Sequence, residues 1–198
     1  LTGTIALLFP HVLGSGFLAI DLALTGQLSW VTMLLLIGFK ILATSSTLGS
    51  GGAGGTFAPA LLLGSMAGGV FGSAAHWLLP DITASAGAYS IVGMAGVLSG
   101  TIHGPLSAIL ILFEMTDNYR IILPLMIACI ISFIASSQIL NESIFTLKLV
   151  RRGVNIKAGK EINVLQSRFV KDAMNPAPET VYEGLSLEEL TSRISESK

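Results

Sequence analysis

A glycine-rich stretch, LGSGGAGGTFAPALLLG, holds the residues whose types and spacing best suit the binding of a ligand. Gly49, Gly51 and Gly54 follow the pattern G-x-G-x-x-G, which cradles a pyrophosphate in a dinucleotide-binding βαβ unit. Gly49, Gly54 and Thr56 nearly fit a phosphate loop, but Gly55 stands where that loop requires lysine. The stretch therefore suggests three possibilities: a nucleotide cradle, a linker, or a site for some other anion.

The context of this stretch argues against a nucleotide. A dinucleotide fold needs a strand before the glycines and an acidic residue about 20 positions after them. Residues 30–49, WVTMLLLIGFKILATSSTLG, instead have the length and composition of a membrane helix, and Asp81 is the first acidic residue that follows.

The start of the next helix suits a small anion better. Thr56-Phe57-Ala58-Pro59 opens a long apolar segment, and the first turn of a helix has unpaired N–H groups and a partial positive charge. Proline is tolerated there because its missing N–H would be unpaired in any case. Inside a membrane bundle such N–H groups can bind a partly dehydrated anion. We therefore expect an anion site at Gly55, Thr56, Phe57, Ala58 and Pro59; the alternative is a re-entrant loop that only packs.

The composition places most of the chain in a membrane. The 198 residues are 52% hydrophobic and 12% charged, with a mean hydropathy of +0.75, against about 25% charged residues in soluble domains. Residues 1–146 hold only seven of the 23 charged side chains. The net charge of −1 gives no reason to expect a nucleic-acid partner, and the single cysteine, Cys129, excludes an internal disulfide.

The predicted anion site lies between apolar segments that are interrupted by glycine and proline. This pattern predicts an all-α bundle of short and broken helices. A helix over Pro105–Met115 would be only roughly 16 Å long, too short to cross a bilayer alone. The predicted helices are 14–25, 30–49, 57–79, 88–103, 105–115 and 121–140.

Small residues at every fourth position predict close helix contacts. The hydrophobic effect does little to drive helices together in lipid, because the lipid tails are as apolar as the side chains. Small residues let two helix backbones approach closely, and the resulting van der Waals packing stabilises the pair. The two stripes are Ala60, Gly64, Gly68 and Gly72 on one helix and Gly96, Gly100 and Gly104 on the next.

The chain becomes polar after Leu147. Residues 148–160 contain five basic side chains, and Glu161 is the lone acid beside them. By the positive-inside rule this end of the membrane segment is cytoplasmic, and we expect a basic linker over 154–168. An ordinary solvated linker would have the same composition. From Phe169 the chain reads as the opening of a soluble unit, with a helix from about Ser186, that stops too soon to close a core.

Two motifs together resemble the CLC family of chloride channels and proton/chloride antiporters. GSGGAGGTFAPALLLGSMAGGVFG resembles its G-G-x-F-x-P stretch, and PLSAILILFEMTDNYRIILPLMI is similar to its bacterial branch. The resemblance covers nearly all of residues 1–153 and implies the C-terminal half of the membrane domain, one half of an inverted repeat. Residues 169–198 resemble the beginning of a CBS domain, so we expect a chain truncated at both ends.

The resemblance carries specific expectations for the anion site. It implies that the amides of Thr56 and Phe57 bind a dehydrated anion, and that a tyrosine hydroxyl at the start of the last membrane helix makes a second contact. Aligning NESIFTLKLVRRG with that helix places Phe145 at the tyrosine position. One hydrogen bond to the ion is then missing, which predicts weaker anion binding; the alternative is that Phe145 only packs and the helix has slipped in register.

The remaining expectations also follow from the resemblance. It implies chloride as the transported ion, with nitrate and fluoride as the open alternatives. It also implies no enzymatic activity, no cofactor or metal, and an adenine nucleotide only with a complete CBS pair. It further implies a homodimer through helices near 106–116 and 121–140, in the bacterial inner membrane with a cytoplasmic C-terminus. The family's G-S-G-x-P and G-x-E-G-P loops, whose residues separate channels from antiporters, belong to the other half of the membrane domain. Both modes of transport therefore remain possible.

Two other classes of function are possible from the sequence, and three polar residues lie within or beside the apolar segments. An intramembrane serine hydrolase would pair Ser50 or Ser99 with His103 or His11, and a membrane receptor or scaffold would bind nucleotide through its tail. We expect Glu114 and His103 to be structural helix-end residues. Lys40 lies within an apolar segment and could snorkel or face an aqueous vestibule, and we assign it no role.

Overall fold

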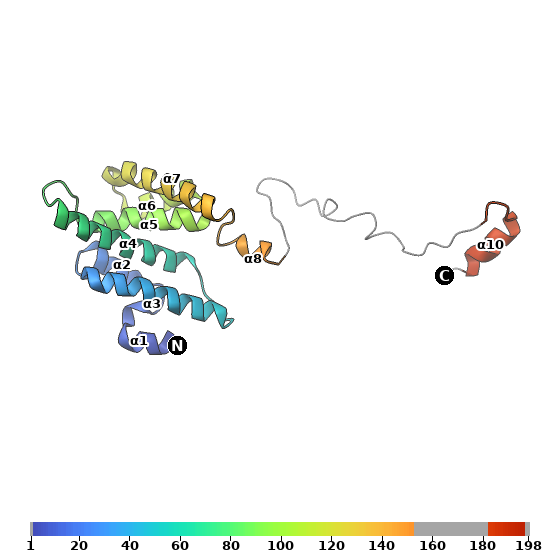
Figure 1. Ribbon diagram of the computed structural model, residues 1–198, viewed down its shortest axis with the longest axis horizontal. Coiled ribbons are helices and arrows are strands. Elements are labelled where there is room, and N and C mark those ends of the chain that lie inside the picture. Colours follow the sequence, from blue (N-terminus) through green and yellow to red (C-terminus); the bar gives the residue numbers. More distant parts are fainter. Residues whose placement is uncertain (1, 153–181, 197–198) are drawn as a thin grey trace. The chain divides into compact units, whose positions relative to one another are not determined.

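The computed structural model describes residues 2–152 and 182–196 (Figure 1). The chain divides into two units, Leu1–Val154 (unit 1) and Asn155–Lys198 (unit 2). Within the described residues both units are helical and contain no strand. The expected all-α fold class is therefore confirmed.

The six helices predicted for unit 1 all form, with ends within three residues of the predicted ones. Two short helices, α1 and α8, are additional to these six and are too short to show a hydrophobic period; α8 lies in the segment where the family resemblance places the start of the last membrane helix. The helices are α1 (Thr2–Leu8), η1 (Pro10–Val12), α2 (Phe17–Leu24), α3 (Trp30–Gly49), α4 (Phe57–Leu78), α5 (Ala86–Ile102), α6 (Pro105–Thr116), η2 (Tyr119–Ile121), α7 (Ile122–Ile139) and α8 (Leu147–Val150).

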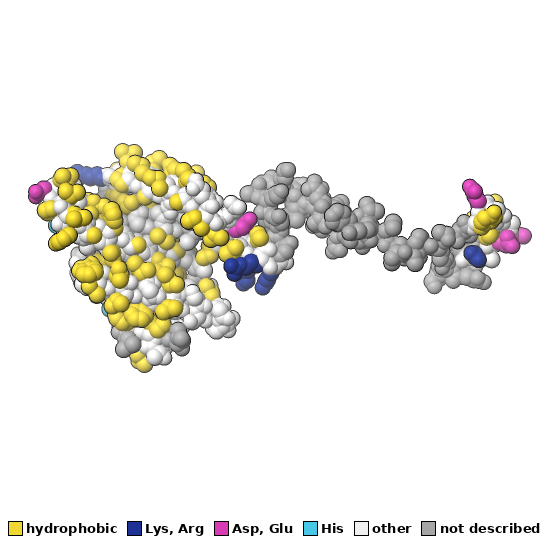
Figure 2. Space-filling view, in the orientation of Figure 1, with side chains coloured by type: hydrophobic (Ala, Val, Ile, Leu, Met, Phe, Trp, Pro, Cys, Tyr) yellow, Lys and Arg dark blue, Asp and Glu magenta, His cyan; other side chains and the backbone are white. Residues whose placement is uncertain are grey.

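Three segments of unit 1 are long and apolar enough to cross a membrane: Trp30–Gly49, Phe57–Leu78 and Tyr119–Ile139. The helices α5 and α6, with 17 and 12 residues, are shorter. Hydrophobic side chains cover much of the visible surface of this unit (Figure 2), as a surface that faces lipid requires.

The first glycine stripe forms the contact between α4 and α5. A Cβ atom on Gly64 would lie 2.5 Å from the carbonyl oxygen of Gly93, and one on Gly68 would overlap the Tyr89 carbonyl. Gly72 lies against the ring of Tyr89, where a Cβ atom would come within 2.8 Å. The stripe on α4 is thus confirmed as a surface of close backbone approach.

The second stripe is confirmed only in part: Gly96 and Gly100 both face α7, but only Gly100 approaches it closely. Gly100 faces α7, where a Cβ atom would lie 2.7 Å from Ser132 Oγ, but the nearest atom to a Cβ on Gly96 is 3.9 Å away. Gly104 lies beyond the end of α5, at the N-cap of α6. The α5 residue that meets the α4 stripe is Gly93, because the face of α5 toward α4 differs from the face toward α7.

The core of unit 1 lies where α4 and α5 meet α2, α3, α6 and α7. Its largest fully buried side chains are aliphatic or methionine, and they come from α3, α4, α5, α6 and α7. They are Met33, Leu36, Leu61, Leu62, Met66, Met94, Leu98, Leu112 and Leu125.

The described part of unit 2 contains the helix α10 (Leu187–Glu196), preceded by a turn. Ser186 Oγ accepts a hydrogen bond from the Glu189 amide at 3.4 Å, and the Ser186 amide donates back to the Glu189 carboxylate at 3.4 Å. This reciprocal pair is a capping box, and it confirms the helix predicted from about Ser186. The predicted linker over 154–168 and the first part of the predicted CBS segment lie outside the described residues.

Candidate anion-binding site at the start of helix α4

The start of α4 has the geometry expected of an anion site. Thr56 is the N-cap residue, and the first helical hydrogen bond runs from the Ala60 amide to the Thr56 carbonyl at 3.1 Å. Pro59 has no N–H, so the free donors of the first turn are the amides of Phe57 and Ala58, with that of Thr56 beside them. The Thr56 side chain makes no capping hydrogen bond. These donors are therefore left for solvent or a ligand.

The glycine run before α4 closes the end of α3. Gly51 has a left-handed φ of 83°, its amide bonds the Leu48 carbonyl at 3.2 Å, and the Gly52 amide bonds the Thr47 carbonyl at 3.0 Å. These are the two bonds of a Schellman motif. The Ser46 carbonyl accepts from the Ser50 amide at 3.0 Å. Three of the last four carbonyls of α3 are thus satisfied within the loop.

The exposure of the predicted site residues differs along the segment. Gly55 and Phe57 are exposed, with Phe57 at 37%, whereas Thr56, Ala58 and Pro59 are partly buried. The donors therefore lie at the boundary of this chain's own packing rather than in its core.

The position of Phe145 is set by the segment that precedes α8. Phe145 is 58% exposed and lies just before α8. Its segment is held to the end of α5, where the Ile144 amide donates to the Thr101 carbonyl at 3.0 Å. Within the described residues no hydrogen bond or ring contact joins Phe145 to residues 55–59, so its place in the site stays a prediction.

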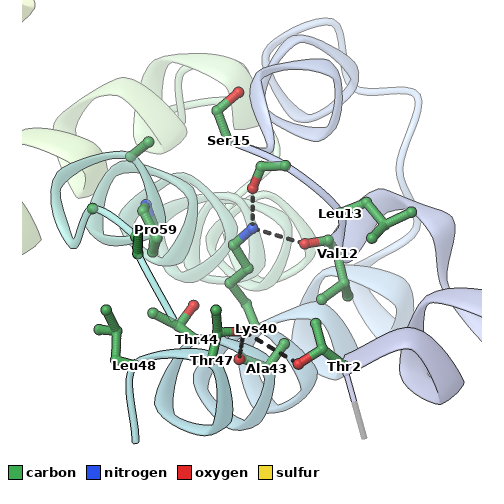
Figure 3. Close-up of a pocket in the computed structure, with 15 residues that line it drawn as sticks. Thr2, Val12, Leu13, Ser15, Lys40, Ala43, Thr44, Thr47, Leu48 and Pro59 are labelled. Atoms are coloured by element: carbon green, nitrogen blue, oxygen red, sulfur yellow. Dashed lines mark hydrogen bonds between the residues drawn. The ribbon is translucent and has the colours of Figure 1, made fainter. Parts of the chain in front are cut away.

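A cavity of about 400 Å³ lies beside the start of α4 (Figure 3). One wall comes from the glycine run and the first turn of α4, another from α3, and a third from the N-terminal residues of unit 1. The residues that line it are Thr2, Val12, Leu13, Gly14, Ser15, Lys40, Ala43, Thr44, Thr47, Leu48, Ala53, Gly54, Gly55, Ala58 and Pro59.

Lys40 is the lining residue to which sequence reasoning assigned no role. Its side chain is only 3% exposed, so the ammonium group does not reach the outer surface of unit 1. Its Nζ donates to the Val12 carbonyl at 2.8 Å and to the Gly14 carbonyl at 2.9 Å (Figure 3). A lysine among uncharged neighbours was the sequence feature that could have marked this position as special. Its hydrogen-bond partners could not be predicted, because they are backbone carbonyls and do not depend on residue type.

The serine and histidine residues considered for a hydrolase do not pair. Ser99 Oγ is buried and donates to the Cys129 carbonyl at 2.8 Å, and Ser50 Oγ donates to the Thr47 carbonyl at 3.0 Å. His103 Nε2 lies 3.3 Å from Ser136 Oγ, whose own proton is donated to the Gly100 carbonyl at 2.6 Å. Within the described residues no histidine is placed to take a proton from either candidate serine.

The helix start, its neighbouring cavity and the membrane-length helices belong to a known class of protein. The family model described as voltage gated chloride channel matches residues 1–137. The chain therefore belongs to this family, and it is part of an integral membrane protein.

Individual relatives agree with the family match. The chain is 35% identical over 151 residues to a putative chloride channel protein ClcB-like from Ralstonia nicotianae, covering 76% of this chain and 35% of that one. It is 34% identical over 151 residues to the H(+)/Cl(-) exchange transporter ClcA from Salmonella arizonae, covering 76% and 32%. The chain thus spans about a third of the length of these relatives.

A solved structure shares the fold. The crystal structure of a slow cyanobacterial Cl-/H+ antiporter superimposes with a TM-score of 0.63 at 33% identity, covering 68% of this chain and 32% of that one. The predicted family and helical architecture are thereby confirmed. The family match ends before the predicted CBS segment, so that segment stays a prediction.

Proposed function

We propose that this chain is part of a protein that moves chloride across a membrane, either as a channel or as a proton/chloride antiporter. The names of the relatives cover both modes: one is a putative chloride channel protein and another is an H(+)/Cl(-) exchange transporter. The start of α4 supports the proposal most directly, because it offers backbone donors with no side-chain cap beside a cavity.

The amides of Thr56, Phe57 and Ala58 are the proposed ligands of the anion. Backbone N–H groups at a helix N-terminus bind anions through both hydrogen bonds and the helix dipole. Gly55 carries no side chain, which lets the ion approach the backbone. Pro59 fixes the first turn without adding a donor. No covalent step and no cofactor or metal are needed for this passage, and we propose no enzymatic activity.

Phe145 is the proposed wall opposite these amides. It retains the aromatic bulk that the family resemblance implies at this position, but it has no hydroxyl to donate to the ion. The backbone amides then carry more of the binding free energy than they would beside a tyrosine.

A substitution that removes one amide tests this site. Phe57→Pro deletes an N–H group at the first helical position, where proline is favoured. Thr56, which is αR, then shifts toward the extended conformation that precedes proline. A hydrogen bond to a charged group contributes about 1.5–3 kcal/mol, so we expect anion affinity to fall at least about tenfold. Phe57→Ala, which keeps the amide but removes the ring, is the matched control.

The measurement is chloride binding by calorimetry and chloride efflux from liposomes that contain the complete protein. If Phe57→Pro and Phe57→Ala change affinity equally, the backbone amide is not a ligand. If the wild-type protein supports no chloride flux, the proposed function is wrong.

The assembly and location of the protein complete the proposal. We propose a homodimer that forms through the outward faces of α6 and α7, in the bacterial inner membrane with the C-terminus in the cytoplasm. Leu106 and Leu110 on α6 and Leu123, Ile127 and Ile131 on α7 each expose more than half of their surface. Residues 154–168 are the proposed basic linker, and 169–198 the proposed start of a CBS domain, which binds adenine nucleotide only as part of a complete pair.

A further inference from the structure

Lys40 is a buried charge within a membrane-length helix. Among the residues that the structure describes, it is the only charged side chain that is buried; the other buried polar side chains are serines. Ionisable groups inside a membrane are costly, and they commonly mark an ion pathway. Its position therefore needs an explanation beyond packing.

The hydrogen bonds of Lys40 do not neutralise its charge. Both acceptors, the carbonyls of Val12 and Gly14, are neutral groups. In the described parts of the chain no carboxylate forms an ion pair with its Nζ. An ammonium group has three N–H donors, and these two bonds use two of them. In its ammonium form Lys40 therefore keeps its positive charge and one N–H donor.

The remaining charge acts on the cavity beside α4. Lys40 and Thr44 line the α3 wall, and Gly54, Gly55 and Ala58 line the wall that leads into the first turn of α4. A charge inside protein acts over longer distances than in water because the effective dielectric constant is lower. The positive end of the α4 dipole adds a potential of the same sign.

We infer that Lys40 is an electrostatic positioning residue for the anion: its buried ammonium group makes the cavity attractive to a small monovalent anion and stabilises that anion at the start of α4. This inference rests on the proposed function and adds to it a fixed side-chain charge beside the backbone ligands.

A purely structural role for Lys40 would explain its hydrogen bonds equally well. In that case Lys40 only ties the loop after η1 to α3, and any side chain that donates to the two carbonyls would serve. The two roles differ in what happens when the hydrogen bonds remain and the charge is removed.

The first test uses Lys40→Gln and Lys40→Arg in the complete protein reconstituted in liposomes. Glutamine keeps an N–H donor without the charge, and arginine keeps both. We expect Lys40→Gln to weaken chloride binding and raise the KM for chloride by about tenfold, and Lys40→Arg to stay close to wild type. Equal chloride affinity in all three proteins, with melting temperature the only property that changes, would overturn the inference.

The second test leaves Lys40 and its hydrogen bonds intact. Thr44 lies one turn after Lys40 on α3 and lines the same cavity (Figure 3). Thr44→Glu places a carboxylate at i, i+4 from the ammonium group, where the two charges attract. We expect Thr44→Glu to weaken chloride binding by about tenfold, and Thr44→Gln, of similar size and neutral, to have little effect.

This pair keeps the inference open to rejection if Lys40→Gln does not fold. Equal loss in Thr44→Glu and Thr44→Gln would show that cavity shape matters and charge does not, which overturns the inference. The chloride flux of the wild-type protein distinguishes failure of this inference from failure of the proposed function. If wild type carries chloride and neither Lys40→Gln nor Thr44→Glu changes the flux, only the role of Lys40 is rejected. If wild type carries no chloride, the proposed function is rejected together with this inference.

Discussion

At the scale of single residues, the site depends on groups that are missing as much as on groups that are present. Pro59 lacks an amide, Gly55 lacks a side chain, and Phe145 lacks the hydroxyl that the family resemblance implies. Pro59 removes one donor from the first turn, and Gly55 leaves the approach to the amides of Thr56 and Phe57 open. Phe145 removes a donor from the proposed opposite wall.

Phe145→Tyr tests that last absence. If Phe145 faces the ion, the new hydroxyl restores a hydrogen bond to a charged group, which contributes about 1.5–3 kcal/mol. We expect chloride to bind about tenfold more tightly, as measured by calorimetry. Phe145→Leu, which also lacks a hydroxyl, should bind no more tightly than wild type. Equal affinity in the tyrosine variant and wild type would mean that position 145 only packs.

Residue types predicted the start of α4 but not the environment of Lys40. Pro59 is enough to place the first turn of α4, because a helix tolerates proline only where its N–H would be unpaired in any case; Thr56 is the N-cap residue but makes no side-chain cap. The partners of Lys40 are backbone carbonyls that lie 26 and 28 residues earlier in the sequence. Such contacts depend on how distant segments pack, and no local pattern records them.

At the scale of elements, the contact between α4 and α5 is the feature most sensitive to side-chain size. Apolar length predicted where these helices lie, and spacing predicted the contact face of α4. Spacing did not predict the facing residue on α5, because glycines lie on more than one face of that helix and each face meets a different neighbour. Gly93 meets α4, whereas Gly100 meets α7.

Gly68→Ala tests the packing of this contact. The added Cβ atom would overlap the backbone of Tyr89, which cannot yield as a flexible side chain can. Overpacking a tight contact costs about 1–3 kcal/mol, so we expect a clear drop in melting temperature in detergent. Gly38→Ala is the control, since a Cβ atom on Gly38 in α3 would meet no neighbouring element within 4 Å. That change should be neutral or slightly stabilising; equal effects would argue against the tight contact.

At the scale of the whole molecule, this chain leaves large apolar faces without partners. The outward residues of α7 include Leu123, Ile127 and Ile131, each more than half exposed. Part of such a surface can face lipid and part can face another protein subunit. The proposed homodimer assigns the α6–α7 face to a second copy of the protein.

Ile127→Gln tests the assignment. An amide side chain in an apolar dimer contact must be buried without a partner, so we expect less dimer. Cross-linking of the complete protein in liposomes measures the dimer fraction. Leu34→Gln on α3, at a similarly exposed apolar position, should leave that fraction unchanged. Equal dimer fractions in both variants would contradict the assignment to α6 and α7.

The loop between α3 and α4 has one further consequence, for the sign of the ion that it accepts. The C-terminal end of α3 carries a partial negative charge and the N-terminal end of α4 a partial positive charge. Bonds from the amides of Ser50, Gly51 and Gly52 occupy the carbonyls at the α3 end, whereas the amides at the α4 end stay uncapped. The two helix ends that meet at this loop therefore differ: most of the terminal carbonyls of α3 are already bonded, whereas the first amides of α4 are free to bind an anion.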